Sequence, residues 1–248
     1  MMDSDEIKNI VKQKYTEIAQ ERGCCCKPEH FQEKDKTIAK QIGYSEEEIA
    51  LAENANMGLG CGNPTALVEI KEGDVVADLG SGAGFDCFLA RKKTGASGYV
   101  IGIDMTKEMI KKARTNALKL GYDNVKFYHA EIEQLPLEND SIDVVISNCV
   151  INLAPDKKKV FEEAYRVLKP GGRLCVSDIV LLGELTAKQR DDPALLAGCV
   201  AGAIPRDEYL NIIKQIGFTI KRIEEDKGIS KTQYQGIPLE SLKIVAIK

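Results

Sequence analysis

The chain has 248 residues, of which 44% are hydrophobic and 29% are charged, and its formal net charge is −4. This length suits one full α/β domain with a small appendage, and the slight acidity excludes a nucleic-acid partner recruited by positive charge. No apolar run approaches membrane-spanning length and the start of the chain has no apolar signal core, so we expect a cytoplasmic monomer without a membrane partner, its eight cysteines mostly reduced.

The first part of the chain predicts short helices around a cysteine cluster. An amphipathic helix is expected over residues 5–21, and the adjacent Cys24, Cys25 and Cys26 follow where a glycine and a proline break it. Residues 27–44 are polar and remain unassigned. Ser45 and Glu48 have the spacing of a capping box, which predicts a helix to about Asn54. We therefore take residues 1–70 as an N-terminal helical, cysteine-bearing segment.

Strand and helix patterns then alternate, which predicts a mostly parallel, doubly wound sheet covered on both faces. The expected strands are 75–79, 99–103, 125–128, 142–147 and 173–178, and the expected helices are 85–93, 106–120 and 156–168. A turn is expected at Pro170-Gly171-Gly172. Beyond this core, we expect broken helical pieces over 179–204, a helix over 207–216, and two antiparallel edge strands at 218–225 and 242–247.

A glycine loop, Gly80-Ser81-Gly82-Ala83-Gly84, follows the first strand and predicts a nucleoside-bearing cofactor. Asp78 would repel a pyrophosphate but suits a cation such as the ammonium of a methionine moiety. Asp104, at the end of the second strand, can accept both ribose hydroxyls. The alternative is a plain strand–turn–helix, but the two acids in register favour S-adenosylmethionine.

Two further features near the sheet are less specific. Glu131-Ile132-Glu133 follows the third strand and could read an adenine edge, although the same residues would also suit a polar loop. His129 is better explained as a strand-end residue than as a catalyst.

Cys149 ends the fourth strand, at the edge of the sheet where ligands bind in doubly wound folds. A buried cysteine is often only a small hydrophobic residue, but the polar Asn148 and Asn152 beside it favour a site. Cys199 and Cys61 lie among glycines and carry weaker signals alone. Because thiolates select soft ions, the combination predicts a soft, thiol-binding substrate beside the cofactor. Cys87 and Cys175 are predicted to be core residues, and the absence of a Cys-x-x-Cys pair argues against zinc.

Several segments together resemble the arsenite S-adenosylmethionine methyltransferases of the short prokaryotic type, over about residues 10–225. The segments are MGLGCGNP, DLGSGAGFDCFLA, VIGIDMTKEM, VISNCVINL, LKPGGRL and GCVAGA, of which GCGNP, SNCVINL and GCVAGA are the most specific. The resemblance implies a class I methyltransferase (Rossmann-like) fold with an appended substrate-binding region. Residues 71–180 would bind S-adenosylmethionine, and residues 181–248 would carry an arsenic-binding segment and strands that complete the sheet.

The resemblance also implies roles for individual residues. Cys61, Cys149 and Cys199 would hold trivalent arsenic as the catalytic thiols, and the N-terminal cysteine that pairs with Cys61 in the family would fall within Cys24–Cys26. Methylation for arsenic detoxification would then consume a thiol reductant, thioredoxin or glutathione. The expected cofactor-binding residues are Asp78, Gly80, Ser81, Gly82, Gly84, Asp104, Met105, Glu131, Ile132, Glu133 and Asn148.

Two other functions fit parts of the sequence. The same scaffold could methylate a quinone, a lipid or another small molecule, with the cysteines incidental; the three cysteine contexts argue against this. The chain could instead be a non-catalytic thiol protein that sequesters metalloid, against which the intact Asp78 and Asp104 argue.

Overall fold

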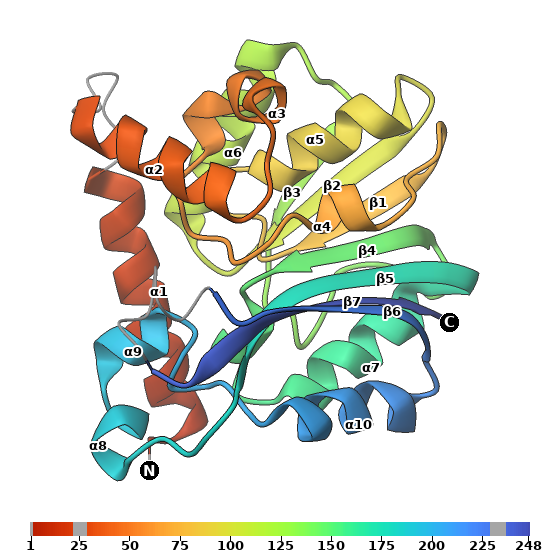
Figure 1. Ribbon diagram of the computed structural model, residues 1–248. Coiled ribbons are helices and arrows are strands. Elements are labelled where there is room, and N and C mark those ends of the chain that lie inside the picture. The colour runs from red at the N-terminus through yellow and green to blue at the C-terminus, as the bar shows by residue number, and fades with distance from the viewer. Residues whose placement is uncertain (1, 22–28, 229–236) are drawn as a thin grey trace.

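A computed structural model describes residues 2–21, 29–228 and 237–248. Its centre is a seven-stranded sheet in the order β3-β2-β1-β4-β5-β7-β6 (Figure 1). The first five strands run parallel, and β7 lies antiparallel between β5 and β6. The predicted class I, doubly wound α/β fold is thereby confirmed.

The N-terminal region consists of helices, as predicted, and also includes two that the sequence did not predict, over 29–41 and 64–67. The capping box of Ser45 and Glu48 is present, but the helix it opens ends at Leu51 and a separate 3₁₀ turn follows. The elements are α1 (Ser4–Glu21), α2 (Glu29–Gln41), α3 (Glu46–Leu51), the 3₁₀ turn η1 (Glu53–Ala55) and α4 (Pro64–Leu67).

The alternating core follows the predicted order closely because its strands are short apolar runs between strong turn signals. Four residues of β1, including Asp78, are buried, as expected for a central strand covered on both faces. The elements are β1 (Val75–Leu79), α5 (Phe85–Thr94), β2 (Tyr99–Asp104), α6 (Lys107–Leu120), β3 (Val125–His129), β4 (Ile142–Asn148), the 3₁₀ turn η2 (Ile151–Leu153) and α7 (Lys157–Val167).

The fifth strand differs from expectation at both ends. The predicted turn at Pro170-Gly171-Gly172 lies inside β5 (Leu168–Leu181), where a register shift opposite β4 absorbs these residues. At its other end β5 continues three residues past Asp178. The reason is β7 (Leu239–Ile247), which pairs with β5 from Arg173 through Leu181 and satisfies its backbone groups.

The C-terminal part adds broken helices and the predicted antiparallel strand pair. The helices are α8 (Ala187–Arg190), α9 (Pro193–Ala197) and α10 (Arg206–Ile216), and β6 (Thr219–Asp226) then pairs with β7.

Helices cover both faces of the sheet and one end of it. One apolar cluster contains residues of α7 and α10, and a second contains residues of α5 and α6, so the sheet separates two cores. Helix α1 contacts α6, α9 and η2, which puts it near the carboxyl ends of the parallel strands (Figure 1). None of the helices in the described part of the chain combines the length and apolar character needed to cross a membrane.

Candidate cofactor and thiol site

The glycine loop between β1 and α5 turns sharply beside the end of β2. Gly80 and Gly82 have positive φ angles of 72° and 52°, a backbone region that glycine adopts without strain. The amides of Gly80 and Ser81 donate to the carbonyl of Ile103 at 2.8 and 2.9 Å, which anchors the loop to β2. A Cβ on Gly82 would meet no atom within 4 Å, so this part of the backbone faces open space that a ligand can occupy.

Asp104 holds the loop and also faces the cavity. Its carboxylate accepts hydrogen bonds from the amides of Gly82, at 3.0 Å, and Thr106, at 2.8 Å. Burial raises the pKa of this carboxyl, and the two amide bonds oppose that rise. Lone pairs remain on both oxygens, so Asp104 can still accept hydrogen bonds from a ligand.

Two more buried acids lie near the loop, and only one was predicted. Burial, followed by the neighbouring Asp86, raises the pKa of Asp78 well above its usual range, and burial raises the pKa of Asp86 to about 6. Among the described residues, no lysine or arginine nitrogen lies within 4.0 Å of either carboxylate. The pair therefore lacks a cation, which a bound ammonium group would supply.

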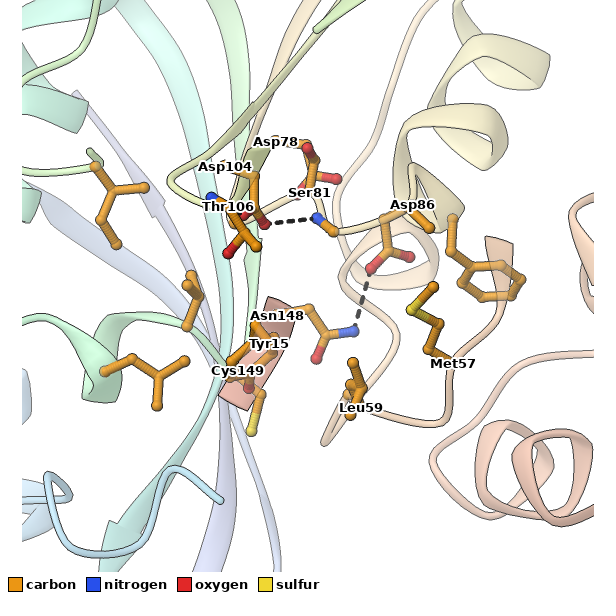
Figure 2. A pocket seen from close by; sticks show the side chains of 18 of the residues that line it. Tyr15, Met57, Leu59, Asp78, Ser81, Asp86, Asp104, Thr106, Asn148 and Cys149 are labelled. Carbon is orange, nitrogen blue, oxygen red and sulfur yellow. Dashed lines mark hydrogen bonds between the residues drawn. The ribbon is translucent and has the colours of Figure 1, made fainter. Parts of the chain in front are cut away.

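These groups line one cavity (Figure 2). The predicted residues Asp78, Gly80, Ser81, Gly82, Asp104, Met105, Ile132, Glu133, Asn148 and Cys149 all line it. Gly84 does not line it and instead begins α5, with a positive φ of 96°. Glu131 is not a lining residue either; its carboxylate accepts hydrogen bonds from Lys8, at 2.6 Å, and Lys12, at 3.2 Å.

Helix α1 forms part of the cavity wall, which the sequence did not predict. Lys8, Val11 and Tyr15 line the cavity from this helix. The only signal was the apolar face of the amphipathic pattern, which equally fits ordinary core packing. The ion pairs of Lys8 and Lys12 with Glu131 tie α1 to the loop after β3.

The fold brings the three predicted thiols together. Cys61 precedes α4, Cys149 follows β4 and Cys199 follows α9, yet all three belong to one buried apolar cluster. The Cys199 thiol donates to the carbonyl of Cys149 at 2.7 Å, and the Cys61 thiol donates to the carbonyl of Ser177 at 3.4 Å. Cys149 also lines the cavity beside the glycine loop, so it belongs both to that cavity and to the thiol cluster.

Two of these cysteines have an unusual backbone. Cys149 and Cys199 have φ angles of 59° and 67°, and Asp140 is the one other non-glycine residue with a positive φ in the described ranges. This conformation costs on the order of 1–3 kcal/mol and often occurs at functional sites. The amide of Cys149 donates to Ser177 at 2.8 Å and that of Cys199 to Leu196 at 3.0 Å, which holds both turns in place.

The surroundings of the three thiols raise the pKa of each. Burial raises the pKa of Cys61. The hydrogen bond with Cys199 lowers the pKa of Cys149, but the Cys61 thiol and burial outweigh it, and the net pKa is well above the usual range. The hydrogen bond with Cys149, together with burial, raises the pKa of Cys199. All three shifts favour the uncharged form of the thiols.

Asn148 links the two halves of the site. Its Nδ2 donates to Asp86, at 3.1 Å, and to the Tyr44 hydroxyl, at 2.9 Å. Its Oδ1 accepts the amide hydrogen of Cys61 at 3.1 Å. Figure 2 shows Asn148 between Asp86 and Cys149. The side chain predicted to contact the cofactor therefore also positions a thiol-bearing loop.

Asp178 is a further residue at the thiols that the sequence did not predict. One of its carboxylate oxygens and the sulfurs of Cys61 and Cys149 all lie within 4.8 Å of one another. Burial raises its pKa to about 6. Its position at the carboxyl end of the predicted fifth strand, like that of Asp104 on the second, was the available signal.

The other cysteines are separate from this cluster. Cys87 and Cys175 are buried in the core on the α5 side of the sheet, as predicted. The Cys24–Cys26 cluster, with its predicted pairing to Cys61, lies outside the described residues. His129 ends β3, and its ring contacts the Met105 carbonyl at 2.9 Å.

Comparison with known proteins gives matches over most of the chain. Residues 70–228 match the family described as "Methyltransferase domain". The chain is 43% identical over 227 residues to an arsenite methyltransferase of Halobacterium salinarum, covering 87% of this chain and 58% of the relative. It is 39% identical over 197 residues to the human arsenite methyltransferase, covering 76% of this chain and 51% of the relative. It thus spans little more than half the length of these curated relatives.

A solved structure matches more completely. The crystal structure of an arsenic(III) S-adenosylmethionine methyltransferase from Chlamydomonas reinhardtii has a TM-score of 0.65 and 34% sequence identity to this chain. The match covers 87% of this chain and 73% of that one.

Proposed function

This chain belongs to the arsenic(III) S-adenosylmethionine methyltransferase family, and we propose that it methylates thiol-bound trivalent arsenic, beginning with arsenite, in arsenic detoxification. The observation that carries the proposal is the thiol cluster. Three cysteines from separate segments belong to one buried apolar cluster, and Cys149 lines the neighbouring cavity as well. Metalloid capture and a methyl donor can therefore meet at one place.

The residues of the cavity fit S-adenosylmethionine. Asp78 and Asp86 are buried acids, and no lysine or arginine of the described residues pairs with them. They would therefore hold the ammonium of the methionine moiety. Asp104 has lone pairs free for ribose hydroxyls, and the buried hydroxyl of Ser81 has no hydrogen-bond partner in the described part of the chain. When bound, the cofactor supplies an electrophilic methyl group on a sulfonium.

The thiols would take up arsenous acid without a change in net charge. Each protonated thiol replaces one hydroxyl on arsenic, forming an S–As bond and releasing a water molecule. Three such exchanges leave a neutral arsenic atom that keeps its lone pair. Because that lone pair is the nucleophile, no proton has to be removed and no general base is required. The protein contributes chiefly by orienting the arsenic toward the methyl group.

Turnover would need electrons from thiols. Methyl transfer formally raises arsenic from the trivalent to the pentavalent state, so two electrons must return it. As part of the same proposal, protein cysteines supply them by forming a disulfide that thioredoxin or glutathione then reduces. We also propose that the enzyme acts in the cytoplasm as a monomer.

The decisive experiment incubates the pure protein with arsenite, radiolabelled S-adenosylmethionine and a thiol, and separates the products by chromatography. We expect labelled methylarsenicals. Cys149→Ala should abolish them, whereas the matched Cys175→Ala variant, which removes a core thiol away from the cluster, should retain them. Arsenite bound without any methylated product would instead favour a thiol sequestration protein. Label transferred only to a quinone or lipid acceptor would favour the small-molecule methyltransferase.

A further inference from the structure

The thiol cluster has an acid beside it, Asp178, that the methylation chemistry above does not use. Asp178 has no exposed surface, and its carboxylate accepts hydrogen bonds from Asn152, at 2.9 Å, the Ile179 amide, at 3.0 Å, and the Tyr209 hydroxyl, at 3.0 Å. These bonds come from η2, β5 and α10, so the carboxylate is held rigidly.

No cation neutralises this carboxylate at close range. Among the described residues, no lysine or arginine nitrogen lies within 4.0 Å of it. Lys157 at the start of α7 interacts with Asp178 through space, but its ammonium donates to the carbonyl of Ala154 at 3.4 Å. A neutral asparagine could make comparable structural bonds without the cost of burying a charge. The charge itself therefore calls for an explanation.

The neighbouring thiols suggest what the charge of Asp178 acts on. The Asp178 oxygen lies within 4.8 Å of the sulfurs of both Cys61 and Cys149. A soft ion bonded to these sulfurs at about 2.3 Å would lie no more than about 7 Å from the carboxylate. At that range in a buried site, a change of one unit charge on the ion alters its interaction with the carboxylate substantially.

Methyl transfer makes that change of charge. The arsenic lone pair forms the As–CH₃ bond while the sulfonium S–CH₃ bond breaks and its electron pair stays on sulfur. Sulfur becomes a neutral thioether, and arsenic, neutral when held by three thiols, acquires the positive charge. A fixed negative charge beside arsenic therefore interacts more favourably with the transition state than with the reactant.

We propose that Asp178 is an electrostatic residue of the arsenic site, whose carboxylate stabilises the positive charge that develops on arsenic during methyl transfer. The inference rests on the proposed function. It assigns Asp178 no proton transfer and no bond to arsenic, because a carboxylate oxygen is a harder ligand than the thiolates.

The test compares Asp178→Asn with wild type at pH 8 in single-turnover methylation of bound arsenite. We expect the rate of methyl transfer to fall about 10- to 100-fold. The dissociation constant for arsenite, measured by dialysis and elemental analysis, should change less than about threefold, because bound arsenite is neutral. Cadmium(II), a soft cation for the same thiols, should bind at least about tenfold more weakly to the variant.

Two control variants separate charge from structure. Tyr209→Phe removes a hydrogen bond to Asp178 but keeps the carboxylate, and it should slow methyl transfer much less than Asp178→Asn does. Asp74→Asn removes a buried carboxylate that pairs with Arg173 at 2.8 Å, before β1 and away from the thiols, and it should leave the transfer rate unchanged.

The outcomes distinguish the two hypotheses. An active wild type that Asp178→Asn matches in transfer rate would overturn the role of Asp178 alone. Loss of arsenite affinity in Asp178→Asn without a slower transfer step would also overturn it, because the residue would then only maintain the pocket. A wild type that binds arsenite but never methylates it would refute the proposed function, and the inference with it.

Discussion

Gly62 allows the Cys61 loop to pack against β5, and Gly62→Ala tests that packing. An added Cβ would lie 2.6 Å from the Oγ and 2.8 Å from the Cβ of Ser177, both on a buried strand residue. Reaching an ordinary contact of 3.4 Å would require the gap to Oγ to open by 3.4 − 2.6, or 0.8 Å. Overpacking of this kind costs about 1–3 kcal/mol of unfolding free energy.

The displacement should reach the neighbouring thiol. The Cys61 carbonyl accepts a hydrogen bond from Ser241 at 2.8 Å, and its amide donates to Asn148 at 3.1 Å, so the loop is held on both sides. We therefore expect Gly62→Ala to weaken arsenite binding at least about tenfold, in addition to its loss of stability.

The clash can be relieved on the strand side. Among the described residues, the Ser177 hydroxyl has no hydrogen-bond partner, and Ser177→Gly removes both clashing atoms. Alone, that change should cost about 1 kcal/mol, as glycine does within a strand. Combined with Gly62→Ala, it should recover both stability and arsenite affinity, with a favourable coupling of about 0.5–3 kcal/mol.

The assay is urea unfolding followed by circular dichroism, because the chain has no tryptophan to report by fluorescence. Gly183→Ala serves as a matched control, since its new Cβ would meet only the exposed ring of Pro238, at 3.3 Å. Wild-type stability in Gly62→Ala would refute the steric argument. Strict additivity in the double variant would show that Ser177 is not the obstacle.

Three further predictions concern the cofactor and thiol residues. Asp104→Ala should lower the affinity for S-adenosylmethionine about 100-fold or more, because each charge-assisted hydrogen bond contributes about 1.5–3 kcal/mol. Arsenite binding should stay nearly intact. Unchanged S-adenosylmethionine affinity in calorimetry would mean that the ribose binds elsewhere. Cys149→Ser and Cys199→Ser should each abolish methylation, because a hydroxyl oxygen is too hard a ligand for arsenic. Substantial turnover by either variant would remove that cysteine from the ligand set. Two variants, Cys61→Ser and a triple serine variant of Cys24–Cys26, should impair methylation of arsenite more than methylation of trivalent methylarsenite. The reason is that methylarsenite offers only two positions for thiolates. Equal loss on both substrates would contradict a role for these cysteines that is specific to arsenite.

The sequence alone determined the sheet and the face of it that carries the site. Short apolar runs followed by Gly80, Asp104 or Asn148 identify strands whose carboxyl ends meet at one edge, because parallel strands joined by crossover helices must align there. Cys149 could therefore be assigned to the site from topology. The backbone of that residue could not be foreseen, because a positive φ at cysteine goes against its local preference.

The tertiary structure decided how distant groups come together at the site. The residues alone gave weak signals for Cys61 and Cys199, which the resemblance grouped with Cys149, and Tyr15 was not predicted. Long-range contacts place these side chains in one cluster with Cys149. The extension of β5 depends likewise on β7, far along the chain. Nothing in the sequence distinguished Asp178 from other acids at the ends of strands. Neighbouring residues in the sequence predict neither the burial of its carboxylate nor the absence of a nearby cation. These properties arise when separate segments pack together, which a local pattern cannot express.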